Sequence, residues 1–260
     1  MFVVNNMKNL KLTPKNLTLI TFVAAEAIIY IVFNVLFGVL PDDPIYVKYC
    51  GVLLCLAVAG ALLYFLKLNK DAVTVFCALI FTAVSDLFIL VLDKYYEVGL
   101  VTFIITQSLY LFRLYSGRVN KIWITLIVRA VLAAVAIGIV GGLASLNFLV
   151  AEVALYIVML TANCVEAFFL IRRGRYNILF AVGLLLFLCC DICVGLDNAG
   201  SVLGLNLPDG LYAFTSWAIW IFYMPSQVLI TLSVNENGVC GEKSEKKEEG
   251  DDDGKAEENS

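Results

Sequence analysis

Long apolar stretches separated by short polar connections dominate the pattern of the chain. A helix that crosses a bilayer needs about 20 mostly apolar residues, and eight stretches meet this requirement: 17–40, 45–67, 71–92, 97–115, 122–144, 147–171, 175–196 and 211–234. A strand of a membrane barrel would alternate polar and apolar residues, whereas segments such as Val131–Val140 are continuously apolar. The pattern therefore predicts an all-α fold, a polytopic membrane bundle of eight transmembrane helices.

The composition excludes several classes of protein. Hydrophobic residues make up 61% of the chain and charged residues 15%, whereas soluble domains are about 45–50% apolar and about 25% charged. The chain has no histidine, which excludes an imidazole base and a His-ligated metal. Cys189, Cys190 and Cys193 lack the second pair of ligands typical of zinc sites. We expect no metal, no cofactor and no nucleic-acid partner.

The distribution of lysine and arginine indicates the orientation. If the N-terminus is cytoplasmic, 15 of the 18 basic residues lie on the cytoplasmic side, while Lys48 and Lys94 lie outside and Arg129 lies within a helix. Cytoplasmic loops of membrane proteins carry such an excess of positive charge. We therefore expect both termini in the cytoplasm. Without an evident organellar transit signal, the plasma (inner) membrane is the expected location.

Charge also divides the chain into segments. We expect a cytoplasmic N-terminal segment over 1–16, the transmembrane domain over 17–234, and an acidic cytoplasmic tail over 235–260. This tail holds 10 acidic and 4 basic residues. A block of like charge without apolar anchors is typical of disorder.

Ionisable residues inside the predicted spans are candidates for function, because they are costly in lipid. They are Glu26, Asp86, Arg129, Glu152, Glu166 and Asp191. Asp86 and Asp191 lie at matching depths in spans 71–92 and 175–196 and are separated by 105 residues. This offset suggests that helices 1–4 and 5–8 form two parallel repeats, an arrangement that other membrane folds use.

Helical spacing gathers polar residues onto shared faces, one of which includes two of these glutamates. Three faces carry them: Glu152, Tyr156, Asn163 and Glu166; Gln107 and Tyr110; and Ser216, Trp220, Tyr223, Gln227 and Thr231. Such groups either hold helices together, at about 0.6–2 kcal/mol for each contact, or line a binding site. Arg129 either neutralises one of the glutamates or extends its charge toward the membrane surface.

The motifs around these residues resemble those of the YhhN family of eight-helix membrane proteins, which includes the lysoplasmalogenases. The similarity covers roughly residues 17–234. Its motifs are Ser85-Asp86-Leu87, Gly99-Leu100-x-x-Phe103-x-x-x-Gln107-x-x-Tyr110, Tyr156, Cys190-Asp191 and Tyr223-Met224-Pro225-Ser226-Gln227, with Lys48 at the lysine of a Lys-Pro pair.

The chain also departs from the family pattern. Gln107 replaces a histidine, and glutamine does not exchange a proton near neutral pH. Cys190 replaces the serine of a Ser-Asp pair, Tyr49 follows Lys48 where the family has proline, and Pro225 lies within the last motif.

The resemblance implies hydrolysis of the vinyl-ether bond of lysoplasmalogens, which releases a fatty aldehyde and a glycerophospho-base. One of Asp86 and Asp191, kept protonated by apolar surroundings, would donate a proton, and the other would stabilise the cation that forms. The expected partners are the bilayer and a lysophospholipid or other lipid. The residues expected to bind it are Gln107, Tyr110, Tyr156, Asn163, Tyr223 and Gln227.

Two alternatives from other classes stay open. In a proton-coupled transporter or flippase, Glu26, Asp86, Glu152 and Asp191 would form a proton relay. Interrupted helices would favour transport, but Pro225 is the only proline within a predicted span. In a non-catalytic lipid-binding or scaffold protein, Gln107 would mark the loss of the reaction.

Overall fold

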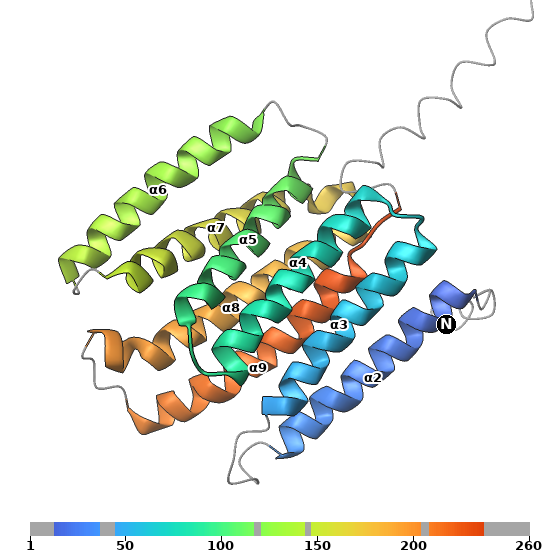
Figure 1. The fold of residues 1–260 in the computed structure, drawn as a ribbon, viewed down its shortest axis with the longest axis horizontal. Coiled ribbons are helices and arrows are strands. Elements are labelled where there is room, and N and C mark those ends of the chain that lie inside the picture. Colours follow the sequence, from blue (N-terminus) through green and yellow to red (C-terminus); the bar gives the residue numbers. More distant parts are fainter. Residues whose placement is uncertain (1–12, 37–44, 117–120, 144–146, 204–207, 237–260) are drawn as a thin grey trace, which may run out of the picture.

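The computed structural model describes residues 13–36, 45–116, 121–143, 147–203 and 208–236 (Figure 1). These ranges are almost entirely helical and contain no strand. Eight helices within them are long and apolar enough to cross a membrane. The predicted fold class is confirmed: the chain is a multi-pass membrane bundle. Segments 1–12 and 237–260 lie outside the described residues, so the N-terminal segment and the disordered tail remain predictions.

The helices follow the predicted spans closely. In chain order they are α2 (Pro14–Leu36), α3 (Ile45–Phe65), α4 (Lys70–Asp86) with the π-helical turn η2 (Leu87–Val91), α5 (Tyr96–Leu114), α6 (Ile122–Leu143), α7 (Phe148–Leu170) with the 3-10 turn η4 (Ile171–Arg173), α8 (Arg175–Leu203) and α9 (Asp209–Leu232).

Two boundaries differ clearly from the prediction. The helix α2 begins at Pro14, three residues before the predicted start, and proline at a first helical position costs no backbone hydrogen bond. The helix α8 continues to Leu203, seven residues beyond the predicted end. The prediction ended where the apolar run ends, but the more polar residues that follow continue the helix.

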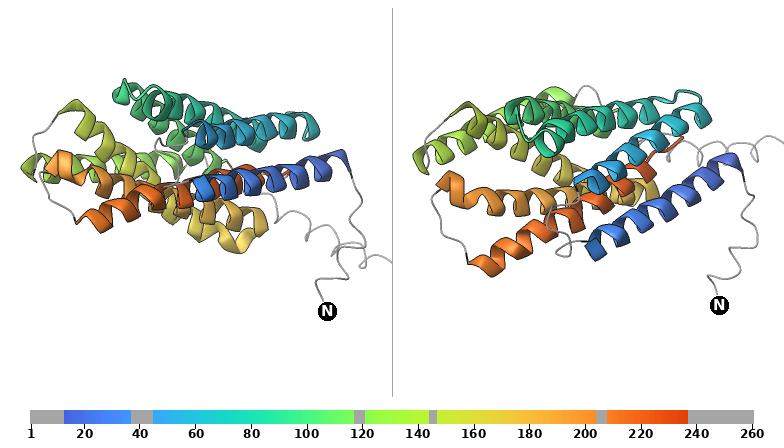
Figure 2. Two further views of the ribbon diagram at one scale, coloured as in Figure 1. Left: turned by 90° about the horizontal axis from the view of Figure 1, so that it is seen from below. Right: turned by 60° about the horizontal axis from the view of Figure 1, so that its bottom comes forward.

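Six helices form a ring in which each contacts the next: α3, α4, α5, α7, α8 and α9, with α9 packing back against α3. The helix α2 packs outside the ring against α3 and α9, and α6 packs outside it against α7. Figures 1 and 2 show these two helices at opposite edges of the bundle. The exposed large side chains of α2 and α6, such as Ile28, Val35, Ile127 and Val131, are apolar, as expected for surfaces that face lipid.

The contacts within the bundle repeat after four helices. The pairs α2–α3, α3–α4, α4–α5 and α5–α7 in the first series correspond to α6–α7, α7–α8, α8–α9 and α9–α3 in the second. Asp86 and Asp191 lie on the corresponding helices α4 and α8. The pattern is the one that two parallel four-helix repeats would produce.

Both series contain a close helix crossing at a glycine. A Cβ atom on Gly183 of α8 would lie 2.9 Å from Ile230 Cγ1 of α9, and a Cβ atom on Gly99 of α5 would lie 2.4 Å from Ile89 Cγ1 of η2. A glycine at such a crossing lets two helices approach closely. These positions therefore depend on the absence of a side chain.

Gly99→Ala is expected to destabilise the protein by about 1–3 kcal/mol, because Ile89 must move to admit the new methyl group. The matched control is Gly138→Ala in α6, where nothing lies within 4 Å of the added Cβ atom. Alanine is preferred to glycine within a helix by about 0.5–1 kcal/mol, so the control should be neutral or stabilising. Thermal unfolding in detergent measures both. Equal stability of the two variants would contradict the prediction.

A buried ion pair joins the helices at the end of the bundle where the first and the last described residues lie. Arg113 of α5 donates from Nε to Asp71 Oδ1 at 2.8 Å and from Nη2 to Asp71 Oδ2 at 2.9 Å. The same guanidinium donates to Ser233 Oγ at 2.8 Å and to the Ser233 carbonyl at 2.7 Å, just beyond α9. It also lies 4.3 Å from the Phe180 ring centre on α8. This arginine therefore connects α4, α5, α8 and α9.

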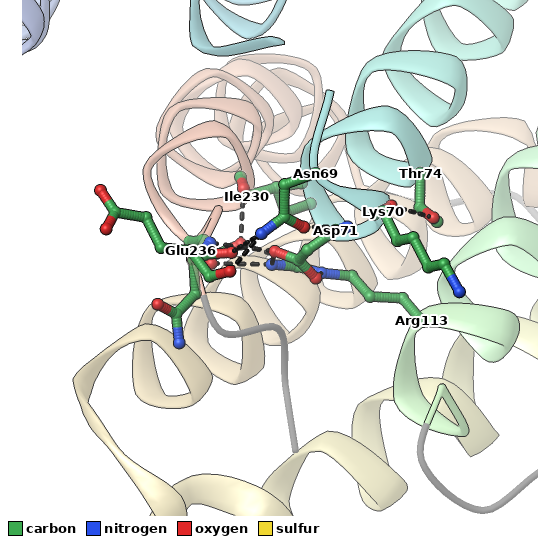
Figure 3. Close-up of polar contacts among 9 residues, drawn as sticks. Asn69, Lys70, Asp71, Thr74, Arg113, Ile230 and Glu236 are labelled. Atoms are coloured by element: carbon green, nitrogen blue, oxygen red, sulfur yellow. Dashed lines mark hydrogen bonds and ion pairs between the residues drawn. The ribbon is translucent and has the colours of Figure 1, made fainter. Parts of the chain in front are cut away.

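The segment after α9 continues the same cluster (Figure 3). Asn235 N donates to Asp71 Oδ2 at 3.0 Å, and the Asn69 amide donates to the Glu236 carbonyl. Asn69 also caps α4, because its Oδ1 accepts from Asp71 N at 2.7 Å. Lys15 of α2 forms an ion pair with Glu236. Residues Lys15, Lys67, Lys70, Lys121, Arg172, Arg173 and Arg175 lie at or beside the helix ends on this side of the bundle, which is called the basic face below.

Candidate functional site

Asp86 lies at the end of α4, where the helix changes from α to π geometry. It is 6% exposed, and Tyr223 OH of α9 donates to its Oδ2 at 2.5 Å. The preceding Ser85 donates to the Gly99 carbonyl of α5 at 2.6 Å, which joins two of the sequence motifs. Single π turns within α-helices occur frequently at functional sites. The sequence analysis missed this turn, because the apolar run Leu87–Val91 reads as an ordinary helix.

Asp191 of α8 has the same kind of partner. Tyr156 OH of α7 donates to Asp191 Oδ2 at 2.5 Å. Asp86 lies within electrostatic range of both Asp191 and Tyr156. The two tyrosine–aspartate pairs therefore belong to one site, built from α4, α7, α8 and α9.

A row of aromatic side chains connects the two pairs. The ring centre of Tyr156 lies 5.6 Å from that of Phe103, which lies 5.8 Å from that of Phe187. Phe187 lies 5.6 Å from Tyr223, and Tyr223 lies 5.7 Å from Trp220. The two pairs are thus joined by a continuous row of aromatic rings, and the faces of such rings can attract a positive charge.

Two of the predicted site residues belong to a separate polar network. Asn163 of α7 donates from Nδ2 to the carbonyl and to Oε1 of Gln107 on α5, both at 2.9 Å. Arg129 of α6 donates to Asn163 Oδ1 at 2.8 Å and to Glu166 Oε2 at 2.7 Å. The sequence left two roles open for Arg129. The structure agrees with the first, because the guanidinium neutralises Glu166. Gln107 and Asn163 make no hydrogen bond to either aspartate within the described residues.

Tyr110 and Gln227, also predicted to bind substrate, are fully buried in the ring. Tyr110 packs edge-on against Phe180 with ring centres 5.4 Å apart. Gln227 lies one helical turn beyond Tyr223 toward the basic face. Its Nε2 and Oε1 atoms have no hydrogen-bond partner among the described residues, and the same holds for Gln107 Nε2. Buried amide atoms are usually satisfied, so a polar group of a bound molecule would be stabilised here.

The sequence analysis placed Lys48 on the outer side of the membrane, but the structure buries it in the bundle. Lys48, on α3, is 1% exposed. The ammonium nitrogen lies 4.1 Å from the Trp220 ring centre and 5.4 Å from that of Phe33. The sequence signal for this burial was the position of Lys48 inside the predicted span 45–67.

The two other carboxylates of the suggested proton relay, Glu26 and Glu152, make different contacts from the aspartates. Glu26 of α2 accepts a hydrogen bond from Cys55 Sγ at 3.4 Å. Glu152 of α7 is buried, and its Oε2 has no hydrogen-bond partner among the described residues. Within those residues no hydrogen bond connects Glu26 or Glu152 to Asp86 or Asp191.

The fold and the site define a class: a polytopic α-helical membrane protein with paired, tyrosine-bonded aspartates inside its bundle. The sequence matches the YhhN family over residues 43–234, which covers α3 to α9. The chain belongs to the YhhN family. The matched range starts after α2 and is thus narrower than the resemblance noted from the motifs. Neither a curated protein nor a solved structure matches the chain significantly.

Proposed function

We propose that this YhhN protein is an intramembrane hydrolase that cleaves the vinyl-ether bond of lysoplasmalogens to a fatty aldehyde and a glycerophospho-base. The observation that carries the proposal is the pair of aspartates inside the bundle, the buried Asp86 and the part-buried Asp191, each of which accepts a hydrogen bond from a tyrosine of the same aromatic row. Paired carboxylates serve as acid and base in other hydrolases that pass through oxocarbenium-like states. The resemblance of the motifs to those of lysoplasmalogenases supplies the substrate class.

In the first step, the carboxylic acid of one aspartate gives its proton to the vinyl carbon farther from the ether oxygen. The electron pair of the double bond forms the new C–H bond, and an oxocarbenium cation remains at the adjacent carbon. The second aspartate, as a carboxylate, stabilises this cation. The rings of Phe103 and Phe187 lie between the two tyrosines, and an aromatic face beside the cation would add to that stabilisation.

In the second step, a water molecule attacks the cationic carbon and gives a proton to a carboxylate of the pair. The resulting hemiacetal transfers its hydroxyl proton to the glycerol oxygen as the C–O bond breaks. One water is consumed, and the products are a fatty aldehyde and a glycerophospho-base. The two carboxyl groups end in their initial protonation states, as turnover requires.

The test is aldehyde release by the purified full-length protein in detergent. The substrate is a 1-alkenyl lysophospholipid, and the matched control is the 1-alkyl lysophospholipid of the same chain length, which lacks the double bond that accepts the proton. Release from the alkenyl lipid alone supports the proposal. A well-folded protein that releases no aldehyde from either lipid contradicts it.

Tyr156→Phe and Tyr223→Phe are each expected to lower kcat/KM for aldehyde release about 10- to 100-fold. Each change removes one O–H donor to a catalytic carboxyl group while the ring and its aromatic contacts remain, and a hydrogen bond to a charged group contributes about 1.5–3 kcal/mol. Tyr30→Phe in α2 is the control, since this tyrosine is remote from both pairs along the chain and outside the ring. Unchanged kinetics in both site variants would contradict the assigned role.

A non-catalytic lipid-binding protein is the second candidate, favoured by the contacts of Gln107. Its Oε1 accepts from Asn163, so the position of the family's histidine serves a polar network between helices instead of proton transfer. This candidate predicts that lysolipid copurifies with the protein and remains intact.

We also propose that both termini are cytoplasmic in the plasma (inner) membrane. The basic face carries both described chain ends and most of the described lysines and arginines, as the positive-inside rule requires of a cytoplasmic side.

A further inference from the structure

A buried lysine that takes no part in the proposed proton transfers contacts Trp220, whose ring contacts that of Tyr223. Lys48 is 1% exposed, and a charged group at such a position in a membrane protein is costly and marks a site of function. Its ammonium lies 4.1 Å from the ring centre of Trp220 and 5.4 Å from that of Phe33. These aromatic faces stabilise the ammonium cation. They hold it on the side of the helix ring where α3 packs against α9.

The position of this cation relative to the aspartates follows from α9. Trp220 lies three residues before Tyr223, about one helical turn, and the two rings are in contact with centres 5.7 Å apart. Tyr223 in turn donates to Asp86 at 2.5 Å. Since α9 ends at the basic face, Trp220 lies about one turn from Tyr223 on the side away from that face, and the Lys48 ammonium contacts the Trp220 ring.

We propose that Lys48 binds the phosphate of the lysophospholipid whose ether bond is held at Asp86 and Asp191. This inference rests on the proposed function and names the group that the site recognises in its substrate. In a lysoplasmalogen the three glycerol carbons separate the ether oxygen from the phosphate oxygen, a span of about 5 Å, similar to one helical turn. A lysine ammonium is a compact cation that binds phosphate as a point charge.

The assignment has a direct consequence for specificity. A 1-alkenylglycerol, which has the same ether bond but no phosphate, gains nothing from Lys48. The lysine therefore selects phospholipids over neutral ether lipids, while the reacting atoms are the same in both.

The experiment measures binding, so that it does not depend on hydrolysis. The probes are a 1-alkyl lysophosphocholine, which cannot be cleaved at a vinyl ether, and the 1-alkylglycerol of the same chain length. Wild-type protein is expected to bind the phosphate-bearing probe about 10- to 100-fold more tightly, as a charge-assisted contact predicts. Lys48→Gln should lose this preference and keep its affinity for the alkylglycerol, and Lys48→Arg should retain most of the preference. Lys94→Gln, which removes an exposed lysine near the same end of the bundle, should bind as wild type does.

Several outcomes would overturn the inference. Equal wild-type affinity for the two probes would do so without any variant, and so would an equal loss of affinity for both probes in a folded Lys48→Gln protein. Displacement of the alkyl lysophosphocholine by an equal concentration of inorganic phosphate would assign the site to a free anion. A phosphate preference that depends on Lys48 in a protein that releases no aldehyde would sustain this inference and remove only the hydrolase. Aldehyde release by a protein without such a preference would support the hydrolase and overturn this inference.

Discussion

Asp86→Asn and Asp191→Asn are each expected to lower aldehyde release by about 10²–10⁴-fold, the usual contribution of a positioned acid or base. Asparagine has nearly the same shape as aspartate and can still accept the hydrogen bond from Tyr223 or Tyr156. It can neither donate a proton to carbon nor carry the charge that stabilises the cation. The loss should therefore fall on kcat, with little change in the binding of an alkyl lysophospholipid.

The control for this pair is Asp197→Asn on α8. Asp197 accepts hydrogen bonds from Ser216 at 2.8 Å and from Thr215 at 3.2 Å, so it holds α8 against α9 and bonds to neither tyrosine of the site. Its replacement should leave turnover near the wild-type value. Turnover that survives in Asp86→Asn or in Asp191→Asn would refute a mechanism with two carboxylates. The double variant should be little worse than either single variant, because the two groups act as one unit.

The fold could largely be predicted because lipid imposes one strong rule on the sequence. A spanning segment must satisfy its own backbone and present apolar side chains, and hydropathy reports both requirements. The features that escaped prediction are those that apolar runs do not encode. The helix α8 extends to Leu203 through more polar residues, and the change to π geometry after Asp86 occurs within a uniformly apolar stretch.

The candidate site could be predicted only in part. A carboxylate inside an apolar span is conspicuous in a sequence, and Asp86 and Asp191 stood out for that reason. Their partners depend on how helices pack: Tyr223 of α9 reaches Asp86 of α4, although the two residues are 137 positions apart. Helical periodicity could place Asn163 on the same face as Tyr156, but it could not show that Asn163 bonds to Gln107.

Arg113→Met is expected to destabilise the protein by about 3–5 kcal/mol, because it leaves the carboxylate of Asp71 buried without its cation. The side chains of Arg113 and Asp71 are 1% and 4% exposed, so water cannot replace the lost contacts. The Ser233 carbonyl and hydroxyl lose their donors as well. The end of α9 should therefore separate from α4 and α5 first, which hydrogen exchange would detect as faster exchange near Ser233.

A second substitution separates the ion pair from the packing of the arginine side chain. Arg113→Met combined with Asp71→Leu removes both charges, and replacing a buried pair by apolar residues is often neutral or even stabilising. The double variant should recover much of the stability that Arg113→Met loses. The matched control is Lys15→Gln, which breaks the ion pair with Glu236, where the side chains are 30% and 65% exposed, and should cost no more than about 1 kcal/mol. If Arg113→Met costs no more than Lys15→Gln in thermal unfolding, the buried cluster does not hold the basic face together.

Function should respond differently from stability, because the cluster makes no hydrogen bond to the aspartate pair among the described residues: Arg113→Met protein that remains folded should still release aldehyde.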